Sequence, residues 1–458
     1  MNLFAQQIKF EDTEGLEHPE GQLITEGDEG ESVAAAVAEV TEEEAGIAED
    51  ERAMDGLVED EETLSEVQEV VEDDAPKMEH TGLTPVGARL AKIVLSRVVG
   101  KRHADKTLPK MEHFNSRSDA RDATSFVQEG VADALKSFWE ALKAQFKKVW
   151  AKVKTWYIKT FSAAKSLHDR AKTIRDRAES SSATIDKKSF QFGQVKQLAV
   201  GGRLKTAEEF GRALDNLAQL VEESSNIDTD AAVDALGDSL DKLVARSDGD
   251  AIGGLKRVVG PQLIAALRSL KEGTGLADAK VLASLGGGDN GDARVAASEV
   301  LPGDRVFVVI TSKETTDLTK TLRMTRMDFV NTKNKPKEIG GDAEAVTLNP
   351  SQIAKFCDVI ATSAGNIADY EAKWQKTDRS QEKVLKAIDD LVRDGAQNIK
   401  DDENADSKKE RELRTVASAA TNFIKRMGGM SAKISGFAMP VYAATLNWCE
   451  GSMRNYKK

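Results

Sequence analysis

The stretch FWEALKAQFKKVWAKVKTWYIKTF, residues 138–161, decides the fold of the middle of the chain. Its apolar residues recur every three or four positions, which is the spacing of one face of an α-helix. No proline occurs between residues 118 and 179, and Gly130 is the only internal glycine. We therefore predict one long helix over 118–179, either unbroken or broken once.

Aromatic and basic residues are interleaved along this predicted helix. Eight of the 24 aromatic residues of the chain fall between Phe126 and Phe161. Seven lysines alternate with them, namely Lys136, Lys143, Lys147, Lys148, Lys152, Lys154 and Lys159. Lysines can neutralise phosphates, while rings such as Trp150, Trp156 and Tyr157 can stack on bases or anchor among lipid headgroups. These ten residues are candidate DNA or lipid contacts. The alternative is that the aromatics form the buried face of the helix and the lysines its solvated face.

Charge divides the chain into three blocks. Residues 1–79 contain 27 acidic and 3 basic residues, a net charge of −24. Residues 81–178 carry a net charge of +12, and residues 179–458 carry −1. The net charge of −13 for the whole chain is therefore an average over an acidic head, a basic middle and a nearly neutral body.

The acidic head, 1–79, is mostly glutamate, aspartate, alanine, glycine and valine, with Phe4 and Phe10 as its only aromatic residues. Such a segment buries too little apolar surface to offset a backbone entropy of about 1–2 kcal/mol per residue. We predict that it is disordered or transiently helical. Two roles fit it: a solubilising tail, or a segment that is removed or that masks a partner site. Residues 80–112 are predicted to form a short basic amphipathic helix, starting at Thr84-Pro85, and a linker.

The rest of the chain is predicted to be mainly helical. A helical subdomain is expected over 189–285, with a capping box at Thr206-Ala-Glu-Glu209, followed by a glycine-rich linker over 286–303. The region 304–458 is expected to be a helical bundle that carries one β-hairpin, formed by 305–311 and 318–330.

Within this bundle, Asn349-Pro350 is expected to cap a helix that runs to about Lys376. Gly428-Gly429 is expected to separate two helices, 405–427 and 431–448. The predicted fold class is mainly α: a helical bundle with one small β-hairpin, preceded by a long basic amphipathic helix in 113–180 and a disordered acidic N-terminal segment.

The distribution of histidines argues against common catalytic and metal sites. All five histidines lie at or before His168, so no Ser-His-Asp, Cys-His or His-rich site can be assembled from the residues that follow. No glycine-rich phosphate loop is complete. Cys357 and Cys449 are expected to be small apolar groups of the core. We expect no enzyme activity, no cofactor and no metal, and the apolar runs are too short for a helix that spans a bilayer.

The pentapeptide PKMEH occurs twice, at 76–80 and at 109–113. Each copy lies at a change of composition, because the first closes the acidic head and the second precedes the long helix. Exposed, extended chain is a natural protease substrate, since the backbone must enter a cleft. The repeat therefore marks two candidate cleavage regions, unless it is a coincidence in a low-complexity segment.

Several features together resemble the internal head (inner-body) proteins of phiKZ-like giant tailed phages. These features are the acidic head, the glutamate-containing repeats at the junctions, the strand Arg305–Ile310, the segment Val346–Ile353 and the long helix that follows it. The resemblance covers mainly residues 190–458. The resemblance implies that the chain is packed with DNA inside the capsid, beside capsid or other inner-body proteins. It also implies that a prohead protease removes an N-terminal propeptide after a glutamate, and that the protein is a candidate for ejection with the genome.

The cleavage sites that the resemblance implies are Glu79 and Glu112, one in each PKMEH repeat. Their Lys-Met-Glu context departs from the small-x-Glu pattern that is usual in such phages. Ile24-Thr25-Glu26 and Leu64-Ser65-Glu66 resemble the Ile/Leu-x-Glu sites of T4-like phages. Glu26 and Glu66 are therefore alternatives.

We expect a non-enzymatic virion protein that is made in the host cytoplasm as an acidic precursor, cleaved, and held inside the phage head against double-stranded DNA. Loss of residues 1–79 would change the net charge from −13 to +11, which favours contact with DNA. Two alternatives stand beside it. One is a membrane-active ejected protein that uses the 126–161 helix as an interfacial segment, and the other is an uncleaved cytoplasmic scaffold or adaptor with an acidic tail.

Overall fold

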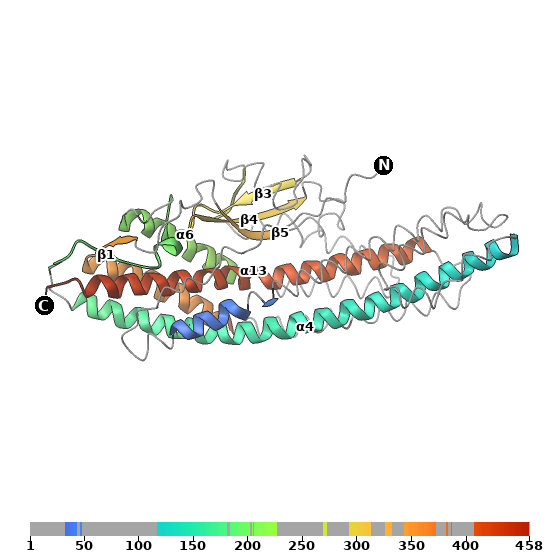
Figure 1. Ribbon diagram of the computed structural model, residues 1–458, viewed down its shortest axis with the longest axis horizontal. Coiled ribbons are helices and arrows are strands. Elements are labelled where there is room, and N and C mark those ends of the chain that lie inside the picture. The colour runs from blue at the N-terminus through green and yellow to red at the C-terminus, as the bar shows by residue number, and fades with distance from the viewer. Residues whose placement is uncertain are drawn as a thin grey trace. The chain divides into compact units, whose positions relative to one another are not determined.

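The computed structural model of the chain is mostly helical, with small antiparallel sheets (Figure 1). It describes residues 33–43, 46–47, 117–180, 184–201, 204, 206–226, 269–272, 293–312, 326–331, 343–371, 382, 386 and 407–457. In the two longest helices, side chains are described from 151 and from 430 onward, and also at 144, 147 and 148. The basic helix predicted within 80–112 lies outside the described residues.

The chain divides into two compact units. The first unit combines Met1–Glu44, Thr155–Ala387 and Ala419–Lys458, and the second combines Ala45–Lys154 and Ile388–Ser418. The two longest helices, α4 and α13, each have residues in both units. The described strands all belong to the first unit.

α4, Arg117–Glu179, is one unbroken helix of 63 residues, which is one of the two forms that the sequence leaves open. Within the first unit, its buried positions repeat every three or four residues, which produces one continuous apolar face. The buried side chains along this face include Trp156, Thr160, Ala164, Leu167, Ala171, Ile174 and Ala178. Along α4, polar contacts join it to helix 33–43, to helix 350–371 and to α13.

α13, Ser407–Met453, is continuous through Gly428 and Gly429, so the predicted division into two helices is wrong. Each glycine costs a helix about 1 kcal/mol relative to alanine. The helix continues because the residues that follow the two glycines are buried on several sides and are ordered by packing. They include Met430, Ile434, Met439, Tyr442, Leu446 and Trp448.

α6, Ala207–Ser225, begins at the predicted capping box. The amide of Glu209 donates to Thr206 Oγ1 at 3.1 Å and so satisfies one of the free amides of the first turn. Phe210 and Leu214 follow at helical spacing, and both are buried. The cap therefore starts the helix in the register that turns its apolar face inward.

Helix 350–371 begins at the predicted Asn349-Pro350 cap. The Gln352 amide donates to Asn349 Oδ1 and the Asn349 amide donates to Gln352 Oε1, both at 2.9 Å. Pro350 occupies the first helical position, where its missing amide needs no partner. The start of this helix is thus determined by local residues, as the sequence predicts.

Three aromatic rings from three helices meet in the core of the first unit. Phe210 of α6, Phe356 of helix 350–371 and Trp448 of α13 have ring centroids 5.3 to 5.9 Å apart. All three rings are buried. Aromatic pairs in such tilted and edge-on arrangements contribute about 0.5–1.5 kcal/mol beyond the burial of their area. This cluster joins the three helices to one another.

A four-stranded antiparallel sheet has the strand order β2-β3-β4-β5. β4, Arg305–Ser312, pairs with β5, Arg326–Asn331, which confirms the predicted pairing for the C-terminal part of 318–330. The expectation of one isolated hairpin is wrong, because this pair belongs to a larger sheet. β3, Ala293–Ala297, pairs with the other edge of β4, and β2, Lys271–Glu272, pairs with β3. β3 lies within 286–303, where the sequence predicts a linker. Its alanine-rich sequence is a weak strand signal, but pairing with the apolar strand β4 covers an edge that would otherwise be open.

A second, two-stranded sheet joins segments that are far apart in the sequence. β1, Ser189–Gln191, pairs antiparallel with β6, Glu344–Val346. Close to β6, Trp448 Nε1 donates to the Val346 carbonyl at 2.8 Å, and the Tyr456 hydroxyl donates to the Leu348 carbonyl at 2.8 Å. The C-terminal residues are thereby bound to the start of helix 350–371.

A glycine in the turn before β4 offers a test of the backbone geometry. Gly303 has φ of +75°, and an added Cβ would lie 3.3 Å from the carbonyl oxygen of Gln197. We expect Gly303→Ala to lower the free energy of unfolding by about 1–2 kcal/mol, because a side chain disfavours the left-handed region. Gly193→Ala is the control, since Gly193 lacks a positive φ and its Cβ would meet no atom within 4 Å. Unfolding followed by circular dichroism measures both variants. An equal loss of unfolding free energy in the two would contradict the positive φ of Gly303.

Candidate interaction site on the long helix

The aromatic residues of α4 that belong to the first unit are buried. Trp156, Tyr157 and Phe161 have exposed fractions of 0%, 2% and 3%. The ring of Tyr157 lies 5.0 Å from that of Trp156 and 5.5 Å from that of Phe161, and burial raises its pKa well above the ordinary value of a tyrosine. In this fold, Trp156 and Tyr157 therefore form part of the core and do not present their rings to a ligand in solution.

The N-terminal helix 33–43 covers Trp156. The indole Nε1 of Trp156 donates to the carbonyl oxygen of Val40 at 3.1 Å. In Figure 1 this short blue helix lies along α4. Val33, Val37 and Val40 are all buried, with exposed fractions of 4%, 7% and 0%, and their spacing places them on one face of the helix.

The acidic head is expected to be disordered or transiently helical, and in the structure residues 33–43 of it form a packed helix. The sequence Val33–Val40 combines alanines, which are the best helix formers, with three valines at positions i, i+4 and i+7. This local pattern is too short to be stable by itself, because isolated helices below about 12–15 residues are marginal in water. The helix forms because its valines are buried when it packs on α4.

An ion pair accompanies the apolar contact. Lys159, one turn after Trp156, has its Nζ 2.9 Å from Glu43 Oε1 and 3.5 Å from Glu39 Oε2. The hydrogen bond to Glu43 raises the pKa of Lys159 above its ordinary value. Glu39 and Glu43 are four residues apart and so lie on the same side of their helix. The basic block and the acidic block of the sequence thus meet at a defined place.

The second unit contains a contact of its own between these two parts of the chain. Lys152 Nζ donates to the carbonyl oxygen of Gly46 at 3.4 Å, and Ile47 beside it is buried. A lysine of the basic helix is therefore used here as a donor to N-terminal backbone.

The other predicted site residues have different environments. Lys147, Lys148 and Lys154 are exposed, whereas Lys152 is half-buried. The side chains of Lys136, Lys143 and Trp150 lie outside the described residues, as do the candidate cleavage sites Glu26, Glu66, Glu79 and Glu112. DNA or lipid contact at the exposed lysines and cleavage at these glutamates both stay predictions.

A buried arginine connects α4 with α13, and sequence reasoning missed it. Arg170 Nη2 donates to Glu450 Oε2 at 3.0 Å and to Asn447 Oδ1 at 2.7 Å. Asn447 in turn donates to Gln194 Oε1 at 2.9 Å. In the sequence, the one sign that Arg170 is buried is its position next to Ala171, a residue of the apolar face. Its partners Asn447 and Glu450 are more than 270 positions away, so the sequence does not indicate them. This network is structural, because each of its hydrogen bonds joins two elements of the core.

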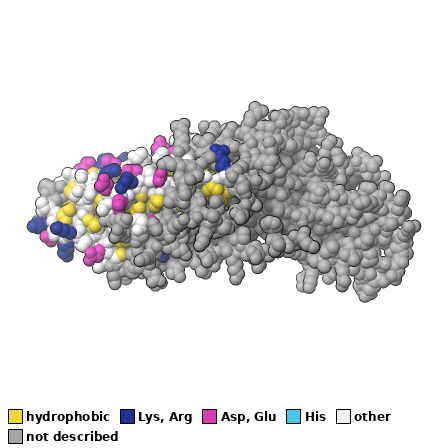
Figure 2. Space-filling model, turned by 90° about the horizontal axis from the view of Figure 1, so that it is seen from above, with side chains coloured by type: hydrophobic (Ala, Val, Ile, Leu, Met, Phe, Trp, Pro, Cys, Tyr) yellow, Lys and Arg dark blue, Asp and Glu magenta, His cyan; other side chains and the backbone are white. Residues whose placement is uncertain are grey.

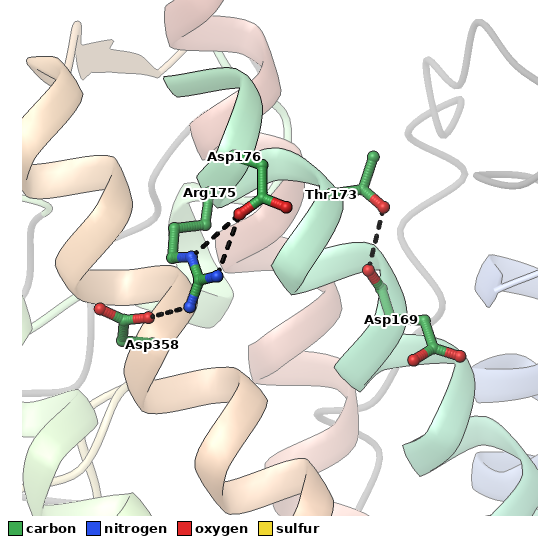
Figure 3. A network of polar contacts seen from close by, with 5 residues as sticks. All are labelled: Asp169, Thr173, Arg175, Asp176 and Asp358. Carbon is green, nitrogen blue, oxygen red and sulfur yellow. Dashed lines mark hydrogen bonds and ion pairs between the residues drawn. The ribbon is translucent and has the colours of Figure 1, made fainter. Parts of the chain in front are cut away.

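Exposed polar contacts link α4 to helix 350–371. Figure 3 shows Arg175, whose guanidinium contacts Asp176 on its own helix and Asp358 on the facing helix, each at 3.0 Å. The hydrogen bond to Asp358, followed by that to Asp176, raises the pKa of Arg175. Exposed ion pairs of this kind contribute little to stability, so they do not determine the packing.

Both cysteines, Cys357 and Cys449, are free and buried, which agrees with the core role predicted for them. Burial raises the pKa of the Cys449 thiol well above its ordinary value, which is unfavourable for reactivity. Within the part of the chain that the structure describes, no group of three or more potential ligand residues is placed to hold a metal ion. Over the same residues, no helix has the length and apolar character needed to cross a membrane.

The surface of the described region carries charges of both signs. Figure 2 shows one face, on which lysine and arginine side chains are interspersed with aspartate and glutamate. On this face, the described part of the surface shows no large region of a single charge.

The fold and the site define a mostly helical protein whose acidic N-terminal helix is held on a long basic helix. A family model of phiKZ-like phage internal head proteins matches residues 32–451. The chain therefore belongs to the phiKZ-like phage internal head proteins, and its location is inside the phage head. Comparison with curated proteins and with solved structures found no match.

The buried arginine provides a test of the network that it organises. We expect Arg170→Met to destabilise the protein by about 3 kcal/mol, because it leaves the Glu450 carboxylate partly buried without its counter-charge. Arg175→Met is the matched control: it removes an exposed arginine that also pairs across helices, and it is expected to leave the unfolding midpoint nearly unchanged. Chemical unfolding followed by circular dichroism measures both, and equal effects of the two variants would contradict the role of burial.

Proposed function

We propose that this protein is a non-enzymatic component of the phage head interior that is made as an acidic precursor in the host cytoplasm. A prohead protease cleaves it after a glutamate, and the basic remainder then lies against packaged double-stranded DNA. The observation that supports this proposal is the docking of acidic helix 33–43 onto α4 at Lys159. In this position, the acidic helix 33–43 would compete with DNA for binding to the basic helix α4.

The charges give the proposal its physical basis. Residues 1–79, with a net charge of −24, belong to the same chain as residues 81–178, with a net charge of +12. Charges within about 8 Å of one another are only partly screened at physiological salt. DNA contacts depend on lysines and arginines that replace the counterions of phosphates. The precursor therefore supplies its own counter-charge, and its removal would favour DNA. Lys147, Lys148 and Lys154 are exposed residues of the basic block, and they are the lysines that the proposal assigns to contact with phosphates.

The candidate cleavage sites differ in their effect on helix 33–43. Glu26 precedes the helix, so cleavage there would leave it attached to the rest of the chain. Glu66, Glu79 and Glu112 follow it, so cleavage at any of these would break its covalent connection to α4. The proposed charge change from −13 to +11 belongs to cleavage after Glu79.

The membrane-active alternative is less well supported. Its interfacial anchors were to be the aromatic residues of 126–161, but Trp156 and Tyr157 are buried. Ile158, with an exposed fraction of 61%, is the large apolar side chain that this part of α4 does present. Among the side chains of α4 that the structure describes, one exposed large apolar residue provides little area for binding to a membrane interface.

The maturation step predicts a particular N-terminus in the virion. Mass spectrometry of protein from mature particles is expected to find a chain that begins at His80 or His113, with Val67 and Gly27 as the starts for the alternative sites. Chains from uncleaved proheads are expected to begin at or near Met1. A full-length chain as the predominant species in mature particles would contradict the proposal.

The electrostatic step predicts a change in DNA affinity. We place a specific protease site after Glu79 of the full-length chain and expect cleavage to strengthen binding to duplex DNA roughly tenfold, with affinity falling steeply as salt rises. We also expect an effect of replacing Lys147, Lys148 and Lys154 with glutamine in the cleaved protein. The slope of log K for DNA binding against log salt concentration is expected to become shallower by about 0.9 for each phosphate that these lysines no longer neutralise. Lys355→Gln, at an exposed lysine of helix 350–371 that pairs with Asp215, is the control. Equal DNA affinity before and after cleavage would contradict the electrostatic role.

A further inference from the structure

We infer that the surface of α4 at Trp156 and Lys159 is a recognition site for an acidic amphipathic helix, and that residues 33–43 occupy it as a tethered cover. The release of this cover rests on the proposed function, because it requires cleavage between the two partners. The recognition itself does not depend on cleavage.

Three kinds of contact converge at this site. Val33, Val37 and Val40 bury one face of the incoming helix. The indole Nε1 of Trp156 donates to the backbone carbonyl of Val40. This hydrogen bond orients the helix and does not depend on which side chain residue 40 carries. The site therefore combines apolar burial with a directed hydrogen bond, and ion pairs are the third kind of contact.

The ion pairs add selectivity for acidic residues. Lys159 contacts Glu43 at 2.9 Å and Glu39 at 3.5 Å, and its own side chain has an exposed fraction of 34%. Counting from Val33, the ligand has small apolar residues at i, i+4 and i+7 and glutamates at i+6 and i+10. An acidic helix with this spacing is the chemical class of ligand that the site fits.

The contact depends on the covalent connection. A helix of this length has little stability in isolation, so a free segment must be ordered at the moment of binding, which lowers its affinity. A covalent connection makes the binding of the segment intramolecular and thereby raises its effective concentration at the site. Cleavage after Glu66, Glu79 or Glu112 removes this advantage, and the segment then dissociates at lower concentrations. Cleavage after Glu26 leaves the connection in place.

Release changes the surface of α4 in two ways. Trp156, which is fully buried under the cover, gains exposure, and Lys159 is separated from both of its carboxylate partners. The mature protein then presents an apolar and cationic site that the precursor hides.

Hydrogen exchange of the full-length protein tests the recognition. We expect the amides of 33–43 to be protected in the wild-type chain, and Lys159→Glu to increase their exchange roughly tenfold, because two attractions become repulsions. The triple variant E39K/E43K/K159E restores the opposite charges and is expected to restore protection. Lys165→Glu is the matched control, since Lys165 is a paired lysine of α4 whose partner is Glu371.

The outcomes separate this inference from the proposed function. Unprotected amides at 33–43 in the wild type, or equal exchange in K159E and K165E, would overturn the recognition site even if virion protein is found to be cleaved. Protection with charge-swap rescue supports the site even if mature particles contain the full-length chain.

Gel filtration tests the release. After cleavage at an inserted protease site following Glu79, we expect the 1–79 fragment to separate from the remainder at micromolar concentration. With the protease site inserted after Glu26 instead, the amides of helix 33–43 are expected to stay protected from hydrogen exchange after cleavage. Co-elution of the 1–79 fragment with the remainder at all concentrations would overturn the release step.

Discussion

The burial of one face of α4, from Trp156 to Ala178, is the constraint on which the first unit depends. A helix that presents a continuous apolar face must have it covered, and several elements share that task. Each covering element is positioned by a different polar contact: helix 33–43 by Trp156, helix 350–371 by the 2.7 Å contact of His168 Nδ1 with the Ala361 carbonyl, and α13 by Arg170. Apolar burial provides the driving force, and these polar groups determine where each helix lies.

The same constraint explains how an acidic segment becomes ordered. Residues 33–43 contain enough alanine and valine to form a helix only when the valines find an apolar surface, and α4 provides that surface. Lys159 then selects for the glutamates that accompany the valines. On the proposed maturation, loss of the head therefore changes both the net charge and the packing of the long helix. A change of charge alone would not uncover Trp156.

On the proposed function, these properties have a physical role. A precursor whose acidic segment lies on its basic helix would be less able to bind nucleic acid before cleavage. The body supports this arrangement through contacts between distant parts of the chain, such as the pairing of β1 with β6 and the bonds of Trp448 and Tyr456 to the residues before helix 350–371. These contacts form a core that does not depend on the N-terminal segment for its aromatic cluster.

Features with local signals can be predicted from the sequence. The long helix α4, the cap of α6 at Thr206 and the cap of helix 350–371 at Asn349 follow from residues within a few positions of one another. The pairing of β4 with β5 follows from two apolar runs that are neighbours in the sequence. Other features become visible only in the folded chain: the continuity of α13 through Gly428-Gly429, the pairing of β1 with β6, the Arg170 network and the docking of residues 33–43. In each of these, the stabilising partner is far away in the sequence. Burial and hydrogen bonding depend on that partner, so no local pattern reveals whether a weak helix or strand former is ordered.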